Sequence, residues 1–189
     1  KDASVVKPLA VGTRVPPGNM VRTQTDEAYD LNAAIARQPT ILIFYRGGWC
    51  PYCNAHLRDL QQSEAQRRDR GYQLLAVSTD TPEQLRATAA SGKFSYTLLS
   101  DVKLEVAAKF GLRYELDERY IAHVKAKPDE REALAHVDLR EQTDGFMLTP
   151  AAFILDRSGT IRFVYANNNY SVRVKQSVLL DAARAALRP

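Results

Sequence analysis

One stretch of the chain, residues 41–57, most strongly limits the folds open to it; it reads ILIFYRGGWCPYCNAHL. The unbroken apolar run Ile41–Tyr45 is typical of a central strand that is buried on both faces. The glycines at 47–48 permit a sharp turn and a close approach of another backbone. Pro51 fits the first position of a helix, where its missing N–H is no loss. The stretch therefore predicts a strand, a turn and a helix over about 51–68.

The only two cysteines of the chain, Cys50 and Cys53, lie at the junction between this turn and the helix. Unpaired N–H groups and the macrodipole at a helix N-terminus favour a thiolate over a thiol. Residues three positions apart share one helix face, so the two sulfurs can form a disulfide. We interpret Cys50 as a nucleophile and Cys53 as the residue that resolves its product.

Two other interpretations of this pair compete with a redox dithiol. A C-x-x-C pair can be half of a zinc site, and His56 follows closely, but a structural site needs four ligands. His123 and His136 are distant in sequence and no second cysteine pair exists, so we expect no metal. A structural disulfide over so short a loop would stabilise little. His56 itself is predicted to lie on the helix surface rather than to act as a catalytic base.

The remaining patterns predict one domain that alternates strands and helices. Residues 1–14 are expected to form an extended arm, and the charged stretch 112–147 an insertion that shapes a substrate or partner surface or is a solvated decoration. Two hairpins are expected, over 20–23 with 28–31 and over 152–156 with 160–165, and two further strands, over 72–78 and 96–99. Helices are expected over 33–37, over 82–91 with Gly92 closing it, after Asp101 as far as Phe110, and from Pro128 through 130–136. A last helix is expected over 174–187, with Val178 on its apolar side.

Composition excludes several classes of function. The net charge of +4 comes from basic residues interspersed with acidic ones, which does not favour nucleic-acid binding. No apolar stretch is long enough to cross a bilayer. The chain begins at Lys1, which would suit a processed product, and we expect a periplasmic or exported protein, with the cytoplasm as the alternative.

The motif around the cysteines resembles that of a known family. Trp-Cys-Pro-Tyr-Cys at 49–53, after a buried strand, resembles the active site of the thioredoxin superfamily. The longer string FYRGGWCPYC is similar to the peroxiredoxin-like branch, the alkyl hydroperoxide reductase and thiol-specific antioxidant proteins, and so is the Gly-x-x-x-Pro segment Gly12–Pro16. This resemblance covers most of the chain and is weakest at the insertion. It implies an α/β thioredoxin-like fold: a central mixed sheet flanked by helices, with an N-terminal hairpin and a helical insertion before the last strands.

The resemblance also implies roles for residues outside the cysteine pair. Trp49, Pro51 and Arg46 would position substrate beside Cys50. Thr149-Pro150 resembles the superfamily's cis-proline that faces the dithiol, which would leave the Thr149 backbone free to pair with an incoming chain.

Two departures from the family weaken the expectation of peroxidase activity. Typical members carry a threonine three residues before the reactive cysteine, where this chain has Gly47. They also carry an arginine at the position of Pro150. Both groups would polarise a peroxide, so slow peroxidase chemistry is expected unless Arg46 substitutes. We read Arg46 as a surface or thiolate-stabilising residue.

The sequence therefore predicts a thiol-dependent oxidoreductase that reduces hydroperoxides or exchanges with disulfides. It would use no cofactor beyond its cysteine pair and an external thioredoxin-type reductant. An alternative is a redox-sensing protein whose dithiol switches a partner surface without turnover.

Overall fold

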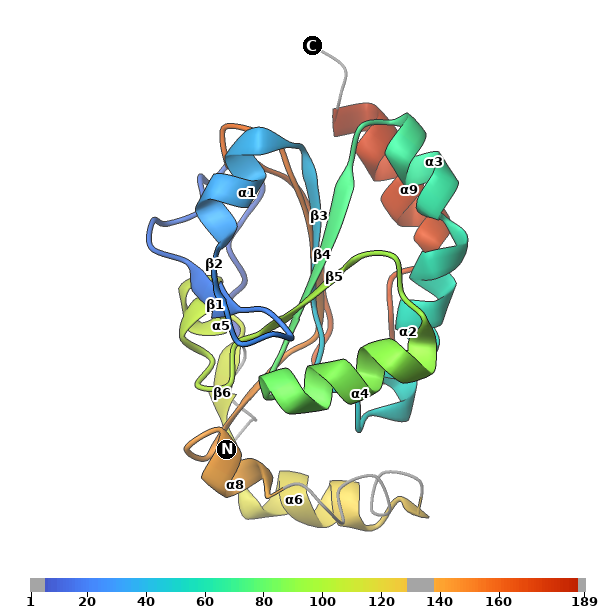
Figure 1. The fold of residues 1–189 in the computed structure, drawn as a ribbon. Coiled ribbons are helices and arrows are strands. Elements are labelled where there is room, and N and C mark those ends of the chain that lie inside the picture. Colours follow the sequence, from blue (N-terminus) through green and yellow to red (C-terminus); the bar gives the residue numbers. More distant parts are fainter. Residues whose placement is uncertain (1–5, 129–137, 187–189) are drawn as a thin grey trace.

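The structure, a computed structural model, describes residues 6–128 and 138–186 of the 189. Its elements alternate between strands and helices along most of the chain (Figure 1). In chain order they are β1 (Met20–Arg22), β2 (Ala28–Asp30), α1 (Leu31–Arg37), β3 (Thr40–Phe44), α2 (Pro51–Gln62), α3 (Glu64–Asp69), β4 (Gln73–Ser78), α4 (Pro82–Gly92), β5 (Thr97–Ser100), α5 (Glu105–Lys109), β6 (Arg113–Glu115), α6 (Glu118–Lys125), α8 (Leu139–Gln142), β7 (Phe146–Leu148), β8 (Ala151–Leu155), β9 (Ile161–Ala166) and α9 (Gln176–Ala186).

A mixed sheet of seven strands, in the order β2-β1-β5-β4-β3-β8-β9, forms the middle layer. Strands β3, β4 and β5 run parallel, whereas β8 pairs antiparallel with β3 and β9 antiparallel with β8. The β1–β2 hairpin joins the other edge through β5. The predicted α/β architecture, including the N-terminal hairpin, the parallel units and the final antiparallel pair, is therefore confirmed.

Strand β3 is central because both of its faces are covered, as the apolar run predicted; every residue from Thr40 to Phe44 is buried. Leu42 and Phe44 join one core cluster with residues of α1 and α5, while Ile41 and Ile43 join a second cluster with α2, α4 and α9. This alternation is the period of two of a strand. The second cluster also contains Cys50 and Cys53, so the dithiol is built on this face.

The helix expected over 51–68 is in fact two helices, broken at Ser63. Ser63 leaves helical geometry (φ −93°, ψ 9°) and its hydroxyl donates to the Leu60 carbonyl at 2.8 Å. A serine that bonds a carbonyl of its own turn competes with the helix ladder, which explains the interruption. Helix α3 begins after this break, where the Arg67 N–H donates a hydrogen bond to the Ser63 carbonyl at 3.0 Å.

Two smaller expectations at helix ends are wrong. Helix α4 includes Gly92, and its left-handed cap is Lys93 (φ 48°). Val178, expected on the apolar side of the last helix, is 45% exposed, whereas Leu179 and Ala183 are the buried residues of α9.

The segment 112–147 is held at its base by a two-stranded sheet, in which β6 pairs antiparallel with β7. Its helices α6 and α8 lie together near one end of the main sheet (Figure 1). Asp117 caps α6 by accepting the Tyr120 N–H at 2.7 Å. The helix expected through 130–136 lies outside the described residues. Among the helices that are described, none is long and apolar enough to cross a membrane.

Candidate active site

The two thiols lie at the start of α2, where the sequence predicted them. Cys50 is the residue that caps the helix, with extended backbone angles, and its sulfur accepts the Cys53 N–H at 3.4 Å. Pro51 occupies the first turn, as expected. Both cysteines are free thiols and both are fully buried. A helix N-terminus that donates an N–H to a sulfur stabilises negative charge on that sulfur.

The turn before Cys50 needs its two glycines for space rather than for unusual backbone angles. Neither Gly47 nor Gly48 is among the glycines with positive φ. A Cβ at position 47 would clash with the Trp49 ring and lie 2.7 Å from Asp80 Oδ1, and one at position 48 would clash with the Thr88 hydroxyl. The threonine that typical family members carry at position 47 therefore has no room here, because Trp49 and Asp80 fill its place.

Two arginines converge on the sulfurs. Arg46 is fully buried, and its Nη1 lies 3.9 Å from Cys50 Sγ. Arg173, from the segment after β9, donates through Nη2 to Cys53 Sγ at 2.9 Å and lies 3.9 Å from Cys50 Sγ. Arg46 is thus no surface residue, and the thiolate-stabilising reading is the one its geometry supports.

Sequence reasoning missed Arg173 altogether. Its contact with Cys50 spans 123 positions, and no spacing or motif links the two residues. Its Nε donates to the Tyr170 carbonyl at 2.8 Å, which fixes the turn that carries it.

Electrostatics make the dithiol a strongly coupled pair. Burial raises the pKa of the Cys50 thiol, and its hydrogen bond with Cys53 and the charge of Cys53 raise it further. Burial works in the same direction at Cys53, but the hydrogen bond from Cys50 and the charges of Arg173 and Arg46 outweigh it and lower the pKa of Cys53 to about 5. The reduced pair therefore holds one negative charge near neutral pH, shared across a thiol–thiolate hydrogen bond.

Aromatic rings surround the Arg46 guanidinium. Its central carbon lies 3.9 Å from the Tyr170 ring centre, 4.5 Å from Trp49 and 5.4 Å from Tyr120. Such cation–π contacts hold a desolvated guanidinium in place. Tyr120 comes from α6, so the insertion contributes a ring to the surroundings of Arg46. Lys127, also from the insertion, donates to the Tyr170 hydroxyl at 2.6 Å.

The expectation for Thr149-Pro150 is wrong. No peptide bond in the described part of the chain is cis. The Thr149 N–H is not free either, because it donates to the Leu112 carbonyl at 2.9 Å. Leu112 is the first residue of the insertion. Its carbonyl therefore occupies the Thr149 N–H with which an incoming chain would have to pair. Thr149 and Pro150 are both buried and directly precede β8.

His56 also differs from its predicted surface position, since its side chain is only 7% exposed. Burial, reinforced by the charge of Arg173, lowers the pKa of His56 to about 4, so the ring is neutral near pH 7. Within the described ranges, no group of three or more His, Cys, Asp or Glu side chains could hold a metal ion.

The family whose sequence pattern matches the chain is the AhpC/TSA family, over residues 11–164. A Haemophilus influenzae protein assigned as the peroxiredoxin bcp is 26% identical over 107 residues, which cover 57% of this chain and 68% of that protein. A Mycobacterium tuberculosis protein assigned as a peroxiredoxin is 32% identical over 93 residues, 48% of this chain and 58% of that protein. The chain thus spans about six-tenths of the latter relative.

Solved structures agree on the fold. The crystal structure of peroxidoxin BcpB from Mycobacterium tuberculosis superposes with a TM-score of 0.72 at 19% identity, covering 95% of this chain and 98% of that one. This likeness confirms the thioredoxin-like fold. The expected export to the periplasm is contradicted, because the chain matches peroxiredoxins of the Bcp type.

Proposed function

The chain belongs to the AhpC/TSA family and is a thiol-dependent oxidoreductase of the peroxiredoxin type, and we propose that it reduces hydroperoxides through a cycle of Cys50 and Cys53. The observation that carries this proposal is the convergence of Arg46 and Arg173 on two buried sulfurs at a helix N-terminus. Cations and helix N–H groups around a thiol stabilise the thiolate, which is the reactive form.

In the first step the proton of Cys50 passes to Cys53 across their hydrogen bond, which leaves Cys50 as the thiolate. Its sulfur attacks the outer oxygen of the hydroperoxide and the O–O bond breaks. The alkoxide that leaves takes one proton from solvent and departs as the alcohol, and Cys50 becomes a sulfenic acid. Cys50 acts as the nucleophile because it is the N-cap residue of α2, one turn before Cys53.

In the second step Cys53 attacks the Cys50 sulfenic acid. The S–O bond breaks, the hydroxide takes the Cys53 proton and leaves as water, and a Cys50–Cys53 disulfide forms. An external dithiol of the thioredoxin type then reduces the disulfide by thiol–disulfide exchange. The cycle needs no metal or organic cofactor, since both electrons are carried by sulfur.

Arg173 supports this chemistry in place of the arginine that Pro150 replaces. Its guanidinium is a charged donor beside both sulfurs. A donor of this kind can stabilise the negative charge that develops on the departing oxygen of the peroxide. Arg46, stacked on Trp49, supplies a second charge from the turn. The redox-sensing alternative is not favoured, because the relatives are peroxiredoxins.

Stopped-flow fluorescence of Trp49, the only tryptophan, tests the proposal. Reduced protein is mixed with hydrogen peroxide, with an organic hydroperoxide and with a small disulfide, as wild type, Cys50→Ser and Cys53→Ser. We expect both peroxides to react much faster with wild type than with a free thiol, Cys50→Ser to be silent, and Cys53→Ser to stop at a sulfenic acid that dimedone traps.

Other outcomes would replace the proposal with a defined alternative. A fast reaction with the disulfide alone would make the protein a thiol–disulfide exchange enzyme. A silent Cys53→Ser variant beside a reactive Cys50→Ser variant would exchange the roles of the two cysteines.

A further inference from the structure

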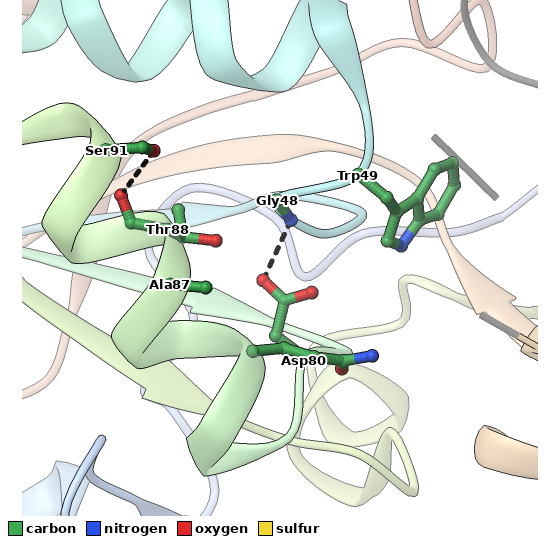
Figure 2. Close-up of a pocket in the computed structure, with 7 residues that line it drawn as sticks. Gly48, Trp49, Asp80, Ala87, Thr88 and Ser91 are labelled. Carbon is green, nitrogen blue, oxygen red and sulfur yellow. Dashed lines mark hydrogen bonds between the residues drawn. The ribbon is translucent and has the colours of Figure 1, made fainter. Parts of the chain in front are cut away.

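One face of α4 and the active-site turn enclose a pocket of about 260 Å³, the α4 pocket (Figure 2). The residues that α4 contributes recur every three or four positions, so they lie on one face of the helix. Most of them are small, and Gly48 has no side chain, so the space between helix and turn stays unfilled. Helix α4 contributes Gln84, Ala87, Thr88 and Ser91, and the turn contributes Gly48 and Trp49.

The α4 pocket has a closed end and an open end. Thr88 is buried, and its hydroxyl packs so closely on Gly48 that a Cβ added there would clash with it. Ala87 and Ser91, by contrast, are exposed. A ligand can therefore enter past Ala87 and Ser91 and reach inward as far as the active-site turn.

The closed end carries a hydrogen-bond donor that the fold leaves unused. The Trp49 side chain is only 7% exposed, and its Nε1 has no acceptor among the residues that the structure describes. In Figure 2 the nitrogen edge of the Trp49 ring is turned toward the Asp80 carboxylate, which also lines the pocket. Buried polar groups are normally hydrogen-bonded, so this N–H calls for a partner from outside the fold.

An acceptor lies beside this donor. A Cβ added at position 47 would meet both Trp49 Nε1 and Asp80 Oδ1, so these two atoms face the same small space. The other carboxylate oxygen, Oδ2, accepts the Gly48 N–H at 2.8 Å and the Ser78 hydroxyl at 3.1 Å, which fixes the carboxylate in place. A ligand at this end therefore meets one N–H that donates and one carboxylate that accepts.

A hydroperoxyl group has the complementary chemistry, because, like a hydroxyl, it both accepts and donates hydrogen bonds. A cation would be attracted by the carboxylate but opposed by the indole N–H, which can only donate. The Trp49 ring and the methyl groups of Ala87 and Thr88 suit an apolar substituent on the ligand. A cavity of about 150 Å³ holds a benzene ring. The α4 pocket therefore has room for an aryl or branched alkyl group.

The α4 pocket adjoins the reactive sulfur through Trp49, the residue before Cys50. The central carbon of the Arg46 guanidinium lies 4.5 Å from the Trp49 ring centre, and Arg46 Nη1 lies 3.9 Å from Cys50 Sγ. Trp49 thus contacts both the pocket and the guanidinium beside the sulfur. A hydroperoxyl group held by the Trp49 N–H is one residue away from the nucleophile.

We propose that the α4 pocket is a specificity subsite for organic hydroperoxides, which receives the aryl or alkyl group while the Trp49 N–H donates to the hydroperoxyl group. The inference rests on the proposed function and deepens it, because it names the class of hydroperoxide that the protein prefers. Hydrogen peroxide has no organic group and gains nothing from the apolar lining. The pocket adds no chemical step, since it acts by holding the substrate beside Cys50.

Binding without turnover is tested on the double variant Cys50→Ser/Cys53→Ser, which has no thiol to oxidise. Trp49 is the only tryptophan, so the protein gives a single indole N–H signal in a nitrogen–proton correlation spectrum. We expect titration with cumene hydroperoxide, an aryl-substituted hydroperoxide, to shift this signal saturably. Adding Ala87→Phe should weaken the binding by about tenfold or more, because a bulky side chain at the mouth takes the space of the ligand.

The rates of the reactive protein give a second readout that a purely structural role would not move. Ala87→Phe should lower the ratio of the rate constants for cumene hydroperoxide and hydrogen peroxide by about tenfold or more, the low end of what a hydrophobic pocket contributes to specificity. Ala90→Phe is the matched control, because it makes the same change on the same helix at an exposed position outside the pocket lining. It should keep the wild-type ratio.

An indole signal that cumene hydroperoxide does not shift overturns the inference, even if Ala87→Phe fails to fold. So does a rate ratio in Ala87→Phe equal to that in Ala90→Phe. The outcomes also separate this inference from the proposed function. Saturable binding to a protein whose wild type reduces no peroxide supports the α4 pocket as a binding site and refutes the peroxidase. Turnover of both peroxides without this binding refutes the subsite alone.

Discussion

The two faces of the central sheet differ in what they bury: one carries an apolar core and the other carries the cysteine pair. On one face Phe44, Phe110 and Phe153 form a cluster with ring centres 5.0 to 6.0 Å apart, and the core around them is apolar. On the other face the same strands lead to Tyr45, Cys50 and Cys53. The cluster on the first face consists of apolar side chains, which need no polar partner. The second buries thiols, guanidinium groups and a carboxylate, which must be paired or neutralised.

The apolar cluster therefore packs against the face of the sheet opposite the dithiol and takes no part in the chemistry of the site. Strand β8 repeats the division, since Phe153 faces the apolar cluster and Ala152 faces the dithiol cluster. Substitutions on the apolar face should therefore change stability, and substitutions on the dithiol face should change reactivity and pH dependence.

The largest effect on stability is expected for Phe153→Ala. Phe153 is fully buried and packs edge-on against two other rings, so its truncation removes apolar contact and leaves a cavity. The free energy of unfolding should fall by about 3–5 kcal/mol, measured by urea denaturation of the reduced protein. The folded fraction should keep the wild-type rate with peroxide. A loss of reactivity larger than the loss of folded protein would contradict the separation of the two faces.

Arg173→Gln should produce the converse result, a loss of reactivity with little change in the free energy of unfolding. Loss of the guanidinium beside both sulfurs should slow the reaction with peroxide by about 10²-fold, the scale known for removal of one charge-stabilising donor. The midpoint of the thiolate titration should also rise, because Arg173 lowers the pKa of Cys53. Arg162→Gln is the matched control, since Arg162 is an exposed partner of Asp156 at 2.8 Å, far from the sulfurs in sequence. A wild-type titration in Arg173→Gln would show that the contact has no electrostatic role.

A smaller effect is expected on the pH dependence of stability. The pKa of Cys53 is lowered to about 5 in the fold, against about 8.5 for an ordinary cysteine. Ionised Cys53 therefore stabilises the reduced protein fully above about pH 8.5, and this contribution is lost as the pH falls toward 5. The free energy of unfolding should rise between pH 5 and 8 more steeply for reduced than for oxidised protein. Parallel profiles for the two redox states would disprove the lowered pKa.

Much of the fold followed from local sequence patterns. The apolar run at 41–45, the turn, the proline after Cys50 and the alternation of strands with capped helices predicted the sheet and the position of the dithiol. These patterns are readable because strand periodicity, capping and helix initiation depend on residues close together in the chain. The break at Ser63 escaped prediction because a single serine in a helical pattern gives only a weak signal.

The sequence by itself determined that Cys50 and Cys53 stand at a helix N-terminus after a buried strand, since that geometry is local. Only the tertiary structure decided what surrounds them. Arg173 arrives from more than a hundred residues away, Tyr120 from the insertion, and the Thr149 N–H is taken by Leu112. These contacts depend on how distant segments pack together, and a pKa depends on that packing because burial and nearby charges set it.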